Sequence, residues 1–212
     1  MNEASGFSAI LTRSFSPLRP LSPETVSELL GHYELLVRWN KTLNLTSIAG
    51  LEEAVLRHYC ESLFVGIHLP TNPVSVLDVG SGAGFPGIPM AVLRPDCRFT
   101  LAESHQRKSV FLREATRRLS NVRVAACRAE KVGGAFDWVV SRAVKWPDVL
   151  KIAPGDELSG TTRPVRTVAL LLGQEDAAEV VLQPAFTWHQ TIPLPWGHRR
   201  VMVLGQTGQP GD

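Results

Sequence analysis

The chain of 212 residues lacks the features that mark membrane and secreted proteins. No apolar run approaches the roughly 18–20 residues that a membrane span needs, and the first 20 residues carry no apolar core of a secretory signal. The three cysteines, Cys60, Cys97 and Cys127, are odd in number and show no Cys-x-x-Cys spacing. They indicate a reducing compartment and argue against a zinc site. We therefore expect a cytoplasmic protein without a bound metal.

The sequence also has little net charge. The 22 basic and 20 acidic side chains leave a formal net charge of +2, so attraction of the whole molecule to nucleic acid is weak. A nucleic-acid surface would have to be a local patch, and the segment 106–119 offers one. Its basic side chains are Arg107, Lys108, Arg113, Arg117 and Arg118. A helix face of this kind can bind phosphates, and a solvated cationic face is the equal alternative.

What the sequence does contain suits one globular unit with an appendage. Residues 1–20 mix serine, proline and arginine, and we expect a flexible N-terminal arm. Residues 21–70 are expected to form a cap of two helices. The first begins at Ser22-Pro23-Glu24, which supplies an N-cap, a proline and an early acid, and the second spans about 52–66.

Residues 71–212 alternate between strand-like and helix-like segments and are expected to be the main domain. The expected strands span 74–79, 99–103, 122–126, 136–141, 165–172, 187–192 and 200–204, and the expected helices 87–93, 106–119 and 147–152. This succession predicts an α/β fold with a mainly parallel, doubly wound sheet of seven strands. The turn at 195–197 predicts that the last two strands form an antiparallel hairpin. The polar segment 156–164 is expected to be a loop.

The most informative stretch is residues 74–89, VSVLDVGSGAGFPGIP. It begins as a buried strand and then breaks into glycine at Gly80, Gly82, Gly84 and Gly87. A strand that enters a glycine-rich turn and then a helix presents backbone N–H groups to a ligand. Glycine is needed because a Cβ would hold the ligand away or clash at positive φ. We therefore expect a nucleotide-like cofactor at this turn.

Two adenosine cofactors compete for the turn. Residues 82–87 match the dinucleotide pattern G-x-G-x-x-G, but Pro86 removes an N–H group that a pyrophosphate would use. The pattern acid-x-Gly-x-Gly-x-Gly, which starts at Asp78, favours S-adenosylmethionine instead. That cofactor has no phosphate, and its cationic amino-acid end suits a nearby acid. A turn that binds nothing is a third, less favoured interpretation.

Positions after the next two strands extend this prediction. Glu103 ends the second strand, where a carboxylate can accept hydrogen bonds from both ribose hydroxyls. Ala129 and Glu130 follow the third strand, where an adenine usually lies, and the small side chain of Ala129 leaves room for the ring. The alternatives are a solvated acid and the start of a surface helix.

Motifs that the sequence lacks also narrow the choice of methyl acceptor. The fourth strand ends in Ser141-Arg142-Ala143-Val144 and lacks the [DN]-P-P-[YF] element that holds an exocyclic amine, and no Pro-Cys pair is present to attack a pyrimidine. Arg142 stays protonated and cannot be the base that a hydroxyl acceptor needs. An acceptor whose lone pair is already free, such as guanine N7, fits because it needs positioning rather than a base. Arg142 would contact the cofactor or the guanine edge, or form only a salt bridge.

Together these residues resemble the bacterial 16S ribosomal RNA guanine-N7 methyltransferases, also called the glucose-inhibited division protein B family. The resemblance covers about residues 22–145 and 165–205. The segments that carry it are WNKTLNLTS, RHYCES, LDVGSGAGFPGIPMAVLRPD, LAESHQRKSVFLRE, RAE and VVSRAV. The long turn with two prolines and the SRA after the fourth strand are its most specific parts.

The resemblance implies a Rossmann-like class I S-adenosylmethionine methyltransferase that acts on N7 of a guanine in the decoding region of 16S ribosomal RNA. The cofactor contacts that it implies are Gly80, Phe85, Ala129, Glu130 and Arg142, to which the physical argument adds Gly82 and Glu103. The candidates for the RNA side are Lys41, Asn44, Arg57 and His58. No side chain is expected to be catalytic, and the expected partner of the monomer is 16S ribosomal RNA or the small ribosomal subunit.

The chain departs from the family pattern in the fifth strand. The family usually has a lysine before a glycine there, whereas this chain has Leu172 before Gly173. Any RNA contact by that lysine is lost. Two alternatives therefore stay open from the sequence: a methyltransferase of the same fold for another substrate, and a non-catalytic relative that binds RNA or the ribosome.

Overall fold

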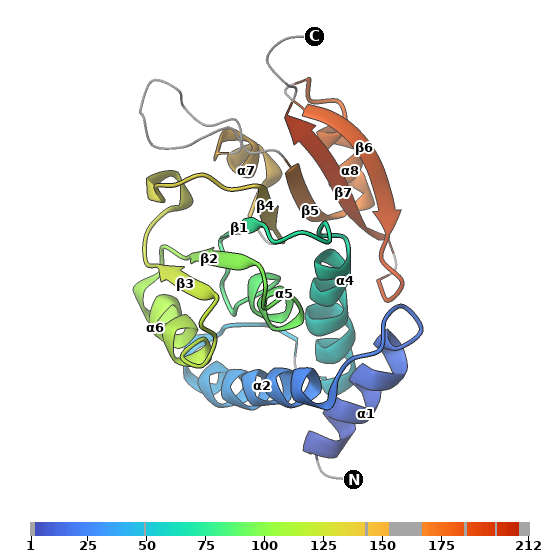
Figure 1. Ribbon diagram of the computed structural model, residues 1–212, viewed down its shortest axis with the longest axis vertical. Helices are drawn as coiled ribbons and strands as arrows, with labels where there is room; N and C mark the ends of the chain where they lie inside the picture. Colours follow the sequence, from blue (N-terminus) through green and yellow to red (C-terminus); the bar gives the residue numbers. More distant parts are fainter. Residues whose placement is uncertain are drawn as a thin grey trace.

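A sheet of seven strands forms the centre of the structure, a computed structural model that describes residues 3–48, 50–142, 144–152, 167–184, 186–197 and 199–207 (Figure 1). The strands are β1 (Ser75–Val79), β2 (Arg98–Ala102), β3 (Val122–Ala125), β4 (Trp138–Ser141), β5 (Thr167–Gly173), β6 (Phe186–Pro193) and β7 (Arg200–Thr207). Their order is β3-β2-β1-β4-β5-β7-β6, with β1 to β5 parallel and β7 antiparallel to β5 and β6. The predicted sheet and hairpin are confirmed; the loop predicted for 156–164 lies outside the described residues.

Helices cover both faces of the sheet. They are α4 (Glu61–Ile67), α5 (Gly87–Leu93), α6 (Gln106–Ala115), α7 (Trp146–Ile152) and α8 (Gln174–Val180). Leu77 of β1 packs in a core with side chains of α7 and α8, whereas its neighbour Val76 packs with side chains of α4 and α5. Apolar side chains on both faces explain why the parallel strands are nearly continuous apolar runs in the sequence.

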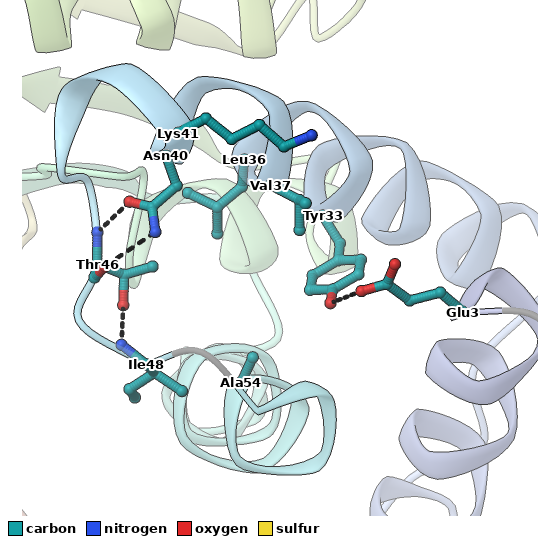
Figure 2. A pocket seen from close by; sticks show the side chains of 9 residues that line it. All are labelled: Glu3, Tyr33, Leu36, Val37, Asn40, Lys41, Thr46, Ile48 and Ala54. Atoms are coloured by element: carbon teal, nitrogen blue, oxygen red, sulfur yellow. Dashed lines mark hydrogen bonds between the residues drawn. The ribbon is translucent and has the colours of Figure 1, made fainter.

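The N-terminal segment corrects one prediction. Instead of a flexible arm over residues 1–20, the chain forms helix α1 (Glu3–Phe15), and Phe7, Leu11 and Phe15 are fully buried. These side chains recur every four residues, so they share one face of the helix. The Tyr33 hydroxyl donates to Glu3 Oε1 at 2.7 Å and links α1 to the next helix (Figure 2). Residues 3–15 therefore belong to the helical cap.

The rest of the cap keeps the predicted helices but changes the second one. Helix α2 (Pro23–Leu43) begins as predicted, and Ser22 Oγ accepts from the N–H of Thr25 at 3.2 Å. The second segment consists of α3 (Leu51–Ala54), a π-helical segment (Val55–Cys60) and α4. π-Helical turns are frequent at functional sites, and this one carries the Arg57-His58 pair.

One apolar core joins the cap to the sheet and its helices. It contains the buried side chains of α1 and α2 together with Leu101 of β2 and Phe111 of α6. An ion pair with a fully buried carboxylate adds a second link: Arg200 Nε of β7 lies 3.0 Å from Glu61 Oε1 of α4. The cap therefore lies firmly against the carboxyl ends of the strands. Among the described residues, no helix combines the length and apolarity needed to cross a membrane.

Candidate active site

Three glycines between β1 and α5 have backbone conformations that favour glycine. Gly80, Gly82 and Gly84 have φ values of 71°, 57° and 90°. The N–H of Gly80 donates to the carbonyl of Ala102 at 2.9 Å, which fixes the turn to the end of β2. A Cβ on Gly80 would collide with the side chain of Val144. Close packing of Val144 against the turn therefore requires a residue without a side chain at position 80.

Asp78 lies beneath this turn. Its Oδ2 accepts from the N–H of Gly87 at 3.0 Å, and its Oδ1 has no partner among the described residues. Full burial raises the pKa of Asp78 to about 7. The sequence predicts that Asp78 lies near the amino-acid end of the cofactor. In the structure Asp78 is fully buried and absent from the residues that line the neighbouring cleft, so it supports the turn instead.

Glu103 stands at the strand-end position that the sequence indicates. Its Oε2 accepts from the N–H of Gly82 at 3.0 Å, and its Oε1 accepts from the N–H of His105 at 2.7 Å. The carboxylate thus joins the glycine turn to the start of α6. Each of its oxygens keeps a second lone pair for a ligand hydroxyl.

Two adjoining hollows surround the turn. The larger one, called the main cleft, has a volume of about 570 Å³, and a side hollow of about 300 Å³ shares Gly80, Ser104 and Val144 with it. The candidate cofactor residues that line the main cleft are Gly80, Gly82, Phe85, Glu103 and Arg142, and those that line the side hollow are Gly80, Ala129 and Glu130. The structure therefore brings all seven candidate cofactor residues together.

Arg142 reaches from the end of β4 to the cap. It donates to the carbonyl of Arg57 at 2.7 Å and to His58 Nδ1, and its guanidinium carbon lies 5.4 Å from the centroid of the Phe85 ring. The His58 ring stacks on the same phenyl ring at 4.6 Å. Burial lowers the pKa of Arg142 to about 10, so the side chain remains charged at neutral pH.

His58 is neutral in this environment. Burial, followed by the charges of Arg142 and Arg57, lowers the pKa of His58 to about 2. Its Nδ1 already accepts from Arg142, and its Nε2 lies 2.8 Å from Thr46 Oγ1. Both ring nitrogens are thus engaged.

The four RNA-side candidates fall in three places. Arg57 and His58 line the main cleft, whereas Lys41 lines a separate hollow of about 270 Å³ inside the cap (Figure 2). Asn44 ends α2 in the left-handed conformation with φ 45° and is absent from the residues lining these hollows. Thr46, which is not among the candidates from the sequence, lines both the main cleft and the cap hollow.

A further hollow of about 470 Å³ lies over the ends of β4 and β5. It shares Arg142 and Val144 with the main cleft, and Leu172 and Arg200 also line it. The departure from the family pattern at Leu172 therefore falls beside the site. Among the described residues, no group of three or more His, Cys, Asp or Glu side chains is placed to hold a metal ion.

The strand order, the acid-first glycine turn and the acid at the end of β2 define a class I S-adenosylmethionine-dependent methyltransferase. Solved structures with this fold include a SAM dependent methyltransferase from Aquifex aeolicus, with TM-score 0.57 and 14% identity over 74% of this chain and 93% of that one. Another is the ribosomal protein L11 methylase from Lactobacillus delbrueckii subsp. bulgaricus, with TM-score 0.56 and 13% identity over 76% and 81%.

Sequence relatives identify the family within this class. Residues 25–181 match the family described as rRNA small subunit methyltransferase G. The chain is 37% identical over 218 residues to Ribosomal RNA small subunit methyltransferase G of Xanthomonas axonopodis pv. citri, covering 96% of this chain and 99% of the relative. It is 36% identical over 172 residues to the protein of that name in Nitrosomonas eutropha, covering 79% of each. The chain belongs to this family, which confirms the resemblance.

Proposed function

We propose that this enzyme transfers the methyl group of S-adenosylmethionine to N7 of a guanine in 16S ribosomal RNA. The observation that carries the proposal is the main cleft, where the glycine turn meets a cation and a neutral, fully engaged histidine at the ends of β1 and β4. The relatives named Ribosomal RNA small subunit methyltransferase G support the choice of substrate.

The residues of the site fit the cofactor. Gly80 and Val144 line both the main cleft and the side hollow, so the two hollows adjoin and an elongated ligand can extend from one into the other. We propose that Glu103 binds the ribose hydroxyls, that Ala129 and Glu130 border the adenine, and that Arg142 binds the amino-acid end. When bound, S-adenosylmethionine supplies an electrophilic methyl group on a sulfonium ion.

Neither His58 nor Glu103 is free to act as a general base in the proposed complex. His58 uses both ring nitrogens, and in the proposed complex the ribose hydroxyls take the lone pairs of Glu103 that the backbone N–H groups leave. A base would have to hold an available lone pair within reach of the acceptor. N7 of guanine carries no proton to remove, so orientation of the base is sufficient. The chain therefore acts by binding, orienting and excluding water.

The oligomeric state, the cellular location and the roles of the cap and the domain are proposals as well. We propose that the chain acts as a monomer in the bacterial cytoplasm on 16S ribosomal RNA or the small subunit. Residues 21–70, extended by α1, would form the cap that covers one side of the cleft, and residues 71–212 the methyltransferase domain. Arg57 borders the main cleft with part of its side chain exposed, and we propose that it contacts RNA.

Methyl transfer to RNA tests this function. The protein is incubated with methyl-labelled S-adenosylmethionine and small-subunit RNA or particles from cells that lack it. We expect label that RNase releases and that maps as N7-methylguanine. Label in protein or a small molecule would establish a different substrate, and absence of cofactor binding would leave only a non-catalytic RNA-binding role.

A matched pair of glycine variants serves as the control. Gly80→Ala adds a Cβ at positive φ against Val144, so we expect at least about tenfold weaker cofactor binding. Gly31→Ala adds a Cβ on α2 with no atom within 4 Å, and we expect no loss of binding or transfer. Equal behaviour of the two variants in calorimetry would contradict the placement of the cofactor beside the turn.

A further inference from the structure

A line of hydrogen bonds runs from α2 toward the main cleft. The side-chain amide of Asn40 clamps the backbone of Thr46: Asn40 Oδ1 accepts from the Thr46 N–H at 2.9 Å, and Asn40 Nδ2 donates to the Thr46 carbonyl at 3.0 Å (Figure 2). The Thr46 hydroxyl accepts from the N–H of Ile48 at 3.1 Å. Thr46 is thus held at its backbone and at its side chain.

The protonation of His58 follows from its partners. A guanidinium group has donors only, so His58 Nδ1 must accept the hydrogen bond from Arg142. Nε2 therefore carries the ring proton and donates to Thr46 Oγ1 at 2.8 Å. By accepting from Nε2–H, the threonine hydroxyl stabilises the neutral form of the imidazole whose Nδ1 accepts from Arg142.

Arg142 needs fixed hydrogen-bond acceptors because other charged side chains also attract or repel its guanidinium. Glu61 is a fully buried carboxylate that attracts the guanidinium, while Arg200 and Arg57 repel it. The two acceptors that hold Arg142 are the carbonyl of Arg57 and Nδ1 of His58, both in the π-helical segment. Loss of the imidazole acceptor would leave one fixed contact about which the guanidinium can turn.

We propose that Thr46 and His58 are positioning residues that fix the direction of the Arg142 guanidinium for the cofactor. This inference rests on the proposed function, since it takes Arg142 as a cofactor contact. The hydroxyl of Thr46 holds the Nε2–H of the imidazole, Nδ1 accepts from Arg142, and the stack on Phe85 fixes the plane of the ring. The cap thereby fixes the direction of a side chain that directly follows β4.

Thr46 provides the first test. Thr46→Val keeps the shape but removes the hydroxyl, whereas Thr46→Ser keeps it. We expect the affinity for S-adenosylmethionine, measured by calorimetry, to fall about tenfold in Thr46→Val and less than about twofold in Thr46→Ser. Thr42→Val is the matched control, because that exposed hydroxyl donates to the Trp39 carbonyl of its own helix. Equal affinities of the valine and serine variants at position 46 would overturn the proposal.

His58 provides a second pair that separates its two hydrogen bonds. Asparagine places its carbonyl oxygen near the position of Nδ1 and keeps an acceptor for Arg142. Glutamine places its amide nitrogen near Nε2 and keeps only the donor to Thr46. We expect His58→Asn to bind the cofactor several-fold more tightly than His58→Gln. A packing role predicts the reverse, because glutamine fills more of the space, and that result would overturn the proposal.

A double-mutant cycle shows whether the effect passes through Arg142. In an Arg142→Met background, we expect Thr46→Val to change cofactor affinity less than about twofold, because its target is gone. Additive losses would overturn the positioning role even if wild-type protein methylates RNA. Coupled losses without RNA methylation would overturn the RNA function and leave the positioning role intact. Wild-type protein that binds no cofactor would overturn both.

Discussion

The carboxyl group of Asp78 makes the stability of the folded chain depend on pH. Burial raises the pKa of Asp78 to about 7, whereas an exposed aspartate titrates near 3.8. Between these values the native state holds a proton that the unfolded chain releases, so the free energy of unfolding falls as pH rises from about 4 to about 7. The slope for one proton reaches about 1.4 kcal/mol per pH unit.

Asp78→Asn removes this titration and keeps an oxygen for the Gly87 N–H. We expect urea unfolding of the variant to show a smaller loss of stability between pH 4.5 and 7 than the wild type. Asp148→Asn is a suitable control because Asp148 is exposed and pairs only with Lys151 among the described residues. An unchanged slope in Asp78→Asn would contradict the raised pKa.

Helix α1 shows how much an element depends on what it packs against. Its 13 residues would be marginal as an isolated helix, and its stability comes from Phe7, Leu11 and Phe15 in the core. Phe7 stacks on Tyr33 at 5.0 Å and meets Tyr59 edge-on at 4.9 Å. We expect Phe7→Ala to lower the free energy of unfolding by about 3–5 kcal/mol. Leu18→Ala, at a side chain 44% exposed, should change it by less than about 0.5 kcal/mol.

The difference between local sequence signals and tertiary contacts explains which elements the sequence predicts. β1, the glycine turn and α2 are predicted because an apolar run, a glycine pattern and an N-cap are local signals. Helix α1 is missed because its apolar side chains lie among serine, glycine and arginine residues. Its stability depends on packing against other elements, which the local sequence does not show. The π-helical segment is missed for the same reason. The contact between His58 and Arg142 joins positions 84 residues apart, which no local pattern indicates.

The whole molecule carries almost no net charge, so binding to RNA must depend on where its cations lie. Arg107, Arg113, Arg117 and Arg118 are exposed on and just after α6, and none forms an ion pair with another described residue. Lys108 of the same helix lines the main cleft. The basic face therefore leads from the edge of the molecule into the site, which suits a strand of RNA whose target base enters the cleft.

Replacement of the four exposed arginines by glutamine tests this surface. Each phosphate contact contributes about 0.7–0.9 to the slope of log affinity against log salt, so we expect the slope for RNA to fall by about 3 if all four bind phosphate. Cofactor affinity should not change, because none of the four lines the main cleft. Arg13→Gln with Arg199→Gln is the control, since both arginines are exposed but already paired with carboxylates. A slope that stays the same in the fourfold variant would place the RNA on another face and leave α6 as a solvated helix.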